Sequence, residues 1–198
     1  MRSCNSHTSK SNSKHTAATM QTSAASTFGF TRGPHRAGAR MRQPAEGLPM
    51  DAPIPEGFRC IEFAPNPFLE RNGPMYGRFR DGEFVLGFRV GSEHCNPAGT
   101  CHGGMMSTLA DMLLILSAAA QADIKRYMTT VSLNTDFVGT AGVGAWLEGR
   151  AQVVRVTRSL VFAQGVMSGN GEAVFRTSGI LKPIGEPDPS LGARRFVS

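Results

Sequence analysis

The longest apolar stretch of the chain runs from Met105 to Ala122 and contains a single charged residue, Asp111. Its other polar residues are Ser107, Thr108, Ser117 and Gln121. The stretch is rich in Ala, Leu and Met and lacks Pro and Gly, which favours a helix. Because apolar residues occur on nearly every side, we predict a buried core helix. A bilayer-spanning helix is disfavoured, since the run is short and an acid and several hydroxyls interrupt it.

Alternating, β-branched segments on both sides of this helix predict six strands. The predicted strands are residues 75–80, 83–90, 128–138, 145–156, 160–168 and 173–182. Asp81-Gly82 and Asn170-Gly171 are pairs typical of tight hairpin turns. The short spacing of turn signals predicts an antiparallel meander and an α+β fold, with one sheet curled around the helix. Such a sheet leaves one side open, which the N-terminal arm, a partner subunit or both must cover.

The segments that flank the predicted domain differ in composition. Residues 1–49 are rich in Ser, Thr, Ala, Gly and Arg, carry seven Lys/Arg against one acid, and are predicted to be a disordered basic leader. This leader is either an over-long translation start or an organelle transit peptide, and it lacks the apolar core of a secretory signal. Residues 50–73 form a predicted Pro-rich arm, 74–183 the domain and 184–198 a C-terminal tail. The arm residues expected to pack against the domain are Phe58, Ile61, Phe63, Phe68 and Leu69.

Charge and cysteine content narrow the possible functions. Residues 50–198 contain fourteen basic and fourteen acidic residues, so the body of the protein has no net charge that would indicate a nucleic-acid partner. Four cysteines are too few for a disulfide scaffold in 198 residues. We expect a cytoplasmic protein, or one of an organelle matrix if residues 1–49 are a transit peptide, and no membrane partner.

A carboxylate inside a buried helix has two explanations. Asp111 either hydrogen-bonds to neighbouring hydroxyls and fixes packing, or it is a catalytic acid, since perturbed acids concentrate at functional sites. The turn before the helix favours the second, because Gly103 and Gly104 lie where backbone N–H groups are unpaired and the helix dipole is positive. Such a turn suits a carbonyl oxygen that becomes negative during acyl transfer.

Two other arrangements around this turn fit the spacing poorly. His94-Cys95 and Cys101-His102 could suggest zinc, but structural zinc sites usually space their cysteines two to four residues apart, and we expect no metal. Cys101 and His102 as a nucleophile and base would lack an orienting acid, and adjacent side chains tend to diverge. We therefore expect Cys101 to be buried and inert.

The spacing within the helix predicts a dimer. Gly103 and Asp111 are eight residues apart, about 12 Å along a helix axis. One reacting carbonyl therefore cannot contact both groups of one chain. If both act in one reaction, two copies must meet with antiparallel helices, which gives a two-fold homodimer with two equivalent sites at its interface.

The pattern Asn96-x5-His102-Gly103-Gly104-x4-Leu109-Ala110-Asp111 resembles the signature of hotdog-fold acyl-CoA thioesterases of the phenylacetic-acid-degradation type, in the 4-hydroxybenzoyl-CoA thioesterase-like superfamily. The resemblance continues through residues 129–141, 146–165 and 171–182 and covers residues 74–182. It implies a hotdog fold, which is a curved antiparallel β-sheet wrapped around one long central helix, assembled as dimers or dimers of dimers.

The resemblance also implies roles for individual residues. The Gly103 N–H, with Asn96 nearby, polarises the thioester carbonyl, and Asp111 of the facing subunit acts as general base or as nucleophile. His102 holds the loop or contacts substrate, and Thr130 supplies a hydroxyl that positions the attacking water. The implied substrate-binding residues are Gly104, Arg158 and Ser159.

We therefore expect an acyl-CoA thioesterase, a hydrolase that releases a carboxylic acid and free CoA. We expect it to need no metal or redox cofactor, and coenzyme A to be part of the substrate. Two alternatives remain open. Another hotdog activity, such as enoyl-thioester hydration, would require a paired Asp and His, whereas a non-catalytic acyl-CoA-binding protein would show no turnover. The preferred acyl group, aryl or alkyl, does not follow from the sequence.

Overall fold

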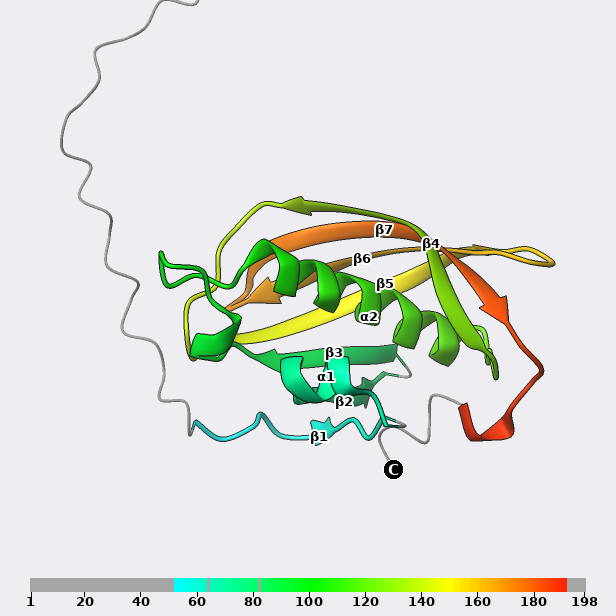
Figure 1. The fold of residues 1–198 in the computed structure, drawn as a ribbon, viewed down its shortest axis with the longest axis horizontal. Helices are drawn as coiled ribbons and strands as arrows, with labels where there is room; N and C mark the ends of the chain where they lie inside the picture. Colours follow the sequence, from blue (N-terminus) through cyan, green and yellow to red (C-terminus); the bar gives the residue numbers. More distant parts are fainter. Residues whose placement is uncertain (1–51, 64, 82, 192–198) are drawn as a thin grey trace, which may run out of the picture. The chain divides into compact units, whose positions relative to one another are not determined.

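The computed structural model describes residues 52–63, 65–81 and 83–191, so the predicted leader lies outside the described part of the chain. The helices are α1 (Pro67–Asn72) and α2 (Gly103–Gln121), with short 3-10 helices η1 (Ser92–His94) and η2 (Pro189–Leu191). The strands are β1 (Arg59–Cys60), β2 (Met75–Arg80), β3 (Glu83–Arg89), β4 (Tyr127–Phe137), β5 (Trp146–Val156), β6 (Val161–Gly169) and β7 (Glu172–Ile184). They form one antiparallel sheet that curves around α2 (Figure 1), which confirms the predicted α+β hotdog fold.

The order of strands across the sheet is β1-β2-β3-β5-β6-β7-β4. Strands β5, β6 and β7 form the predicted meander, but the prediction was wrong for β4, which pairs with β7 at the edge of the sheet. Strand β5 pairs with β3 on one side and β6 on the other, so β4 cannot pair with it. The segment between β4 and β5, residues 138–145, is also too long for a tight hairpin. This segment crosses to the start of α2, where Cys101 N donates to Ala141 O at 2.7 Å.

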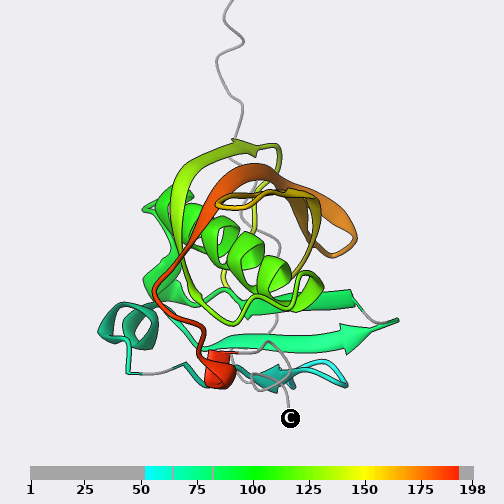
Figure 2. The same cartoon turned by 90° about the vertical axis from the view of Figure 1, so that its right-hand side faces the viewer.

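Helix α2 lies against the inner face of the sheet, which curls around it in the end-on view of Figure 2. Ten of its 19 residues are buried, which confirms the predicted core helix. Glycine lets the sheet approach closely: a Cβ on Gly179 would lie 2.8 Å from Leu114 Cδ1. One side of the helix is only half-buried, at Ser107, Thr108, Asp111, Met112 and Ile115. By length and composition α2 is also the one helix among the described residues that could cross a membrane.

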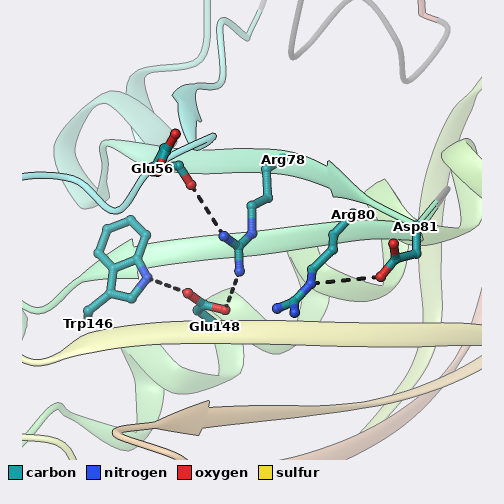
Figure 3. A network of polar contacts seen from close by, with 6 residues as sticks. All are labelled: Glu56, Arg78, Arg80, Asp81, Trp146 and Glu148. Carbon is teal, nitrogen blue, oxygen red and sulfur yellow. Dashed lines mark hydrogen bonds and ion pairs between the residues drawn. The ribbon is translucent and has the colours of Figure 1, made fainter.

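The N-terminal arm is fastened to the outer face of the sheet. The Arg78 guanidinium on β2 lies 4.3 Å from the centroid of the Phe58 ring. It donates to Glu148 Oε2 at 3.0 Å and to Glu56 O at 3.3 Å (Figure 3). Trp146 Nε1 donates to the other oxygen of Glu148 at 3.1 Å. These contacts tie the arm to β2 and β5.

The predicted packing of the arm is confirmed for four of its five apolar residues. Phe58, Ile61 and Leu69 are buried, and Phe63 is partly buried against the core. The prediction was wrong for Phe68, which is 57% exposed. Phe68 and Leu69 are adjacent in a six-residue helix that contacts the core on one side, so both cannot face inward.

Candidate active site

A narrow antiparallel turn leads into α2. His102 N donates to His94 O at 2.8 Å, and Asn96 N donates to Thr100 O at 2.9 Å. The Asn96 side chain stays within this turn, because its Oδ1 accepts from Ala98 N at 3.0 Å and its Nδ2 donates to Thr100 Oγ1 at 2.9 Å. Asn96 therefore shapes the turn, and its implied role beside a thioester carbonyl stays a prediction.

The start of α2 presents an unpaired backbone donor. His102 is the N-cap residue, and its Nδ1 accepts a hydrogen bond from Gly104 N at 2.9 Å. The Gly103 N–H has no acceptor among the described residues, and it lies at the positive end of the helix dipole. Of the two glycine amides in the sequence motif, Gly103 is the available donor and Gly104 is engaged.

Replacing His102 by Ala is expected to lower the free energy of unfolding by about 1 kcal/mol, because the helix loses its N-cap acceptor. His102→Asn keeps an acceptor and should recover most of that loss. Urea unfolding followed by circular dichroism measures both variants. If they unfold like the wild type yet both lose activity, His102 contacts substrate rather than holding the loop.

Asp111 lies half-buried near the middle of α2, and Thr130 Oγ1 of β4 donates a hydrogen bond to its Oδ1. The hydroxyl and the acid implied by the family resemblance are thus adjacent in the structure. No Lys, Arg or His is paired with Asp111 in the described part of the chain. The carboxylate is oriented by Thr130, and no residue that the structure describes neutralises it by an ion pair.

A β-bulge in β4 makes this contact possible. Thr130 pairs with Leu181 and Ser132 pairs with Ile180, so Val131 is an extra residue without a cross-strand partner. Strict alternation would place Thr130 and Ser132 on the same outer face. The inserted residue reverses that alternation and turns Thr130 inward, toward α2.

Asp111 opens into a groove of about 470 Å³ between α1 and α2. The other residues that line it are Asn66, Phe68, Leu69, Ser107, Thr108, Met112 and Ile115. The sequence patterns used above did not indicate the α1 side, although Asn66-Pro67 is a typical helix start. A larger hollow of about 620 Å³ on the outer face of β4 to β7 contains neither Asp111 nor Gly103, so the smaller groove is the candidate site.

One chain does not bring all the predicted site residues together. Gly103 and Asp111 are two helical turns apart, about 12 Å along the axis. The turn that contains Arg158 and Ser159 follows the part of β5 that hydrogen-bonds to Gln121, the last residue of α2. It therefore lies at the opposite end of the helix from Gly103. The donor, the acid and the implied substrate-binding turn occupy three separate places.

The cysteines near the turn do not form a second reactive site. Cys101 is buried, as predicted, and burial together with the nearby Cys95 raises the pKa of its thiol to about 12. A thiol that stays protonated at neutral pH is a poor nucleophile, which argues against a Cys101–His102 pair. Among the residues that the structure describes, no three His, Cys, Asp or Glu side chains lie close enough to share a metal ion.

His94 is expected to make the stability of the fold depend on pH. It is 5% exposed, its Nδ1 accepts from Gly91 N at 2.8 Å, and burial lowers its pKa from the ordinary 6.5, against a smaller opposite effect of Glu93. The unfolded chain therefore binds the proton more readily than the folded one. The contribution of neutral His94 is fully present above pH 6.5 and is lost as the pH falls through the lowered pKa.

Thermal unfolding between about pH 5 and about pH 8 measures this effect. His94→Asn keeps an acceptor but does not titrate in this range, so its melting temperature should depend less on pH than that of the wild type. The same pH dependence in both proteins would contradict a role for His94.

Comparisons with known proteins converge on one family. The family model described as "Thioesterase superfamily" matches residues 98–173. The Pseudomonas aeruginosa protein named "Putative esterase PA0474" is 36% identical over 130 residues, which are 65% of this chain and 96% of that protein.

Solved structures share the fold. The Escherichia coli PaaI protein of the phenylacetic acid degradation operon is 20% identical, with a TM-score of 0.51 over 57% of this chain and 81% of that one. BH2602 of Bacillus halodurans, solved with CoA, is 24% identical, with a TM-score of 0.51 over 56% of this chain and 74% of that one. At these identities the likeness concerns the fold alone.

Proposed function

Since the chain belongs to the thioesterase superfamily and is a thioester hydrolase, we propose that it hydrolyses acyl-CoA esters, with Asp111 as the reacting acid. The overall reaction consumes one water, breaks the thioester C–S bond, and gives a carboxylic acid and the CoA thiol. The observation that carries this proposal is the Asp111 carboxylate, which accepts a hydrogen bond from Thr130, opens to a groove, and is the one charged group of α2. The CoA found with BH2602 supports CoA as the thiol part of the substrate.

In this mechanism Asp111 acts as general base or as nucleophile. As a base it takes a proton from the attacking water while Thr130 keeps the carboxylate oriented. As a nucleophile it forms an anhydride with the acyl group and expels the thiolate, and water then cleaves the anhydride. In both cases the Gly103 N–H stabilises the negative charge that develops on the carbonyl oxygen.

The proposed site lies between two protomers, because Gly103 and Asp111 of one chain are about 12 Å apart. Gly103 of one protomer would lie opposite Asp111 of its partner, with the two α2 helices antiparallel. Two features support this arrangement. Strand β4 is an edge strand of 11 residues with Tyr127 60% and Val131 57% exposed, and such an edge readily pairs with another strand. The half-buried side of α2 is the second feature, because a partner subunit would bury its partly exposed apolar residues Met112 and Ile115.

A thiol-release assay of the full chain on a panel of acyl-CoA esters tests the proposed substrate. Release of CoA from any of them supports the proposal, and binding of the esters without turnover would contradict it.

Hydration of an enoyl ester would require a histidine beside Asp111, and no histidine is among the described residues that line the groove.

Mixing two inactive variants tests whether the site is shared. Asp111→Asn retains the Gly103 donor, and Gly103→Pro retains the acid, so a heterodimer contains one site with both groups intact. Random mixing makes half of the dimers heterodimers, so co-expressed chains should recover about a quarter of wild-type activity. No recovery in dimers shown to have mixed would contradict a shared site.

A further inference from the structure

The groove beside Asp111 has an apolar wall that the proposed mechanism does not use. Met112 and Ile115 follow Asp111 along α2, and Phe68 and Leu69 line the α1 side. Asp111 is the one ionisable residue among the described residues that line the groove, so no cation faces it there. The space next to the reacting acid is therefore suited to uncharged, apolar groups.

Helix α1 is held in place firmly enough to act as a wall. Asn66 caps it, because Asn66 Oδ1 accepts from Leu69 N at 3.2 Å while Asn66 N donates to Glu70 Oε1 at 3.2 Å. Leu69 is buried in the main core cluster and so anchors α1 to the core. Phe68, one residue earlier, is 57% exposed and lines the groove. Its apolar surface is available to a ligand.

The α1 side of this wall lies outside the segment that matches the family model, whereas Met112 and Ile115 lie inside it. The family match begins at residue 98, whereas the α1 side of the groove comes from residues 66–69. The acid and the wall opposite it thus belong to different parts of the chain. Changes in the arm can alter the shape of the groove without changing α2.

Resting on the proposed function, we propose that the groove receives the acyl group, that the substrates are thioesters of uncharged, apolar acyl groups, and that Phe68 sets their size. The reacting carbonyl lies at Asp111, so the acyl group attached to it extends along Met112, Ile115 and Phe68. Contact with these side chains removes apolar surface from water. A carboxylate on the acyl group would instead lie near the Asp111 charge without a compensating cation.

Wild-type kinetics test the substrate class. For straight-chain acyl-CoA esters, kcat/KM should rise about fourfold with each added methylene until the groove is full, since burial of one CH₂ contributes about 0.8 kcal/mol. Butanoyl-CoA and succinyl-CoA have the same chain length and differ in a terminal carboxylate. We expect kcat/KM to be about a hundredfold lower for succinyl-CoA. Equal values for the two esters would overturn the proposal.

Two variants test the role of Phe68. Phe68→Ala should lower kcat/KM for the best long-chain ester about tenfold, and the loss should shrink as the acyl chain shortens. Phe68→Trp should move the preference to shorter esters. The matched control is Phe79→Ala, which removes a phenylalanine of β2 that is 40% exposed and does not line the groove. The control should leave the acyl-chain profile unchanged.

The outcomes separate this inference from the proposed function. If the protein hydrolyses acyl-CoA but both Phe68 variants keep the wild-type profile, the inference is overturned and the proposed function stands. If the wild type hydrolyses no ester, both are overturned. Sedimentation velocity of Phe68→Ala supplies a further test, because dissociation to monomers with a uniform loss on every ester would assign Phe68 to the subunit interface and overturn its role in specificity.

Discussion

An Asp111→Asn variant is expected to hydrolyse acyl-CoA esters about 10³-fold more slowly than the wild type, whether the acid acts as base or as nucleophile. Asn has nearly the same shape and can still accept the Thr130 hydrogen bond through Oδ1. It cannot take up a proton from water or carry the negative charge of the carboxylate. Steady-state thiol release measures the change in kcat.

Two controls make this result specific to position 111. Isothermal titration calorimetry should show that the Asp111→Asn protein keeps its affinity for acyl-CoA esters. Asp123→Asn should retain full activity, because Asp123 pairs with Lys125 at 3.2 Å beyond the end of α2 and lies outside the groove. Asn also tolerates the φ of 46° at that position. Undiminished hydrolysis by Asp111→Asn would remove Asp111 from the mechanism.

Gly103→Pro is expected to lower kcat by about 10²- to 10³-fold, because it deletes a backbone donor to the carbonyl oxygen. The fold should accept the change. Proline is favoured at the first position of a helix, where its missing N–H breaks no helical hydrogen bond. His102 already has the extended backbone that a residue before proline requires, with φ −64° and ψ 139°. Thiol release and a circular dichroism melt measure activity and folding.

Gly103→Ala distinguishes a requirement for the Gly103 N–H from a requirement for the free space next to Gly103. This variant keeps the N–H, and its added Cβ would lie 3.7 Å from the Phe137 ring, an ordinary contact distance. It should therefore fold normally and lose much less activity than Gly103→Pro. Equal losses in the two variants would show that substrate needs the space above Gly103 rather than its N–H.

Local patterns were sufficient to predict α2, the hairpin turns and the fold class. Asp81 and Asn170, for example, have the positive φ that a tight hairpin turn requires. The residue types at these two positions were sufficient to predict the turns. The position of β4 was not predictable in this way. Alternation of apolar and polar residues identifies a strand but does not show which strand it pairs with. Strand β4 pairs with β7, which is the last strand in the sequence.

The candidate site shows the same division between local and tertiary information. Gly103 and Asp111 were found because they belong to one helix and its first turn. The inward orientation of Thr130 depends on the extra residue at Val131, which contradicts simple alternation, so only the resemblance to a family indicated it. The α1 side of the groove was missed because tertiary packing, not spacing, brings residues 66–69 beside α2.

The docked arm gives the protein a built-in optical reporter. Trp146 is the single tryptophan of the chain, and its ring centroid lies 5.1 Å from that of Phe58 on the arm. Lifting the arm would hydrate the indole and shift its emission to longer wavelength without any attached dye. The same arm leads into α1 and Phe68. Tryptophan fluorescence recorded during addition of an acyl-CoA ester would therefore report whether ligand binding displaces the arm that carries the α1 side of the groove.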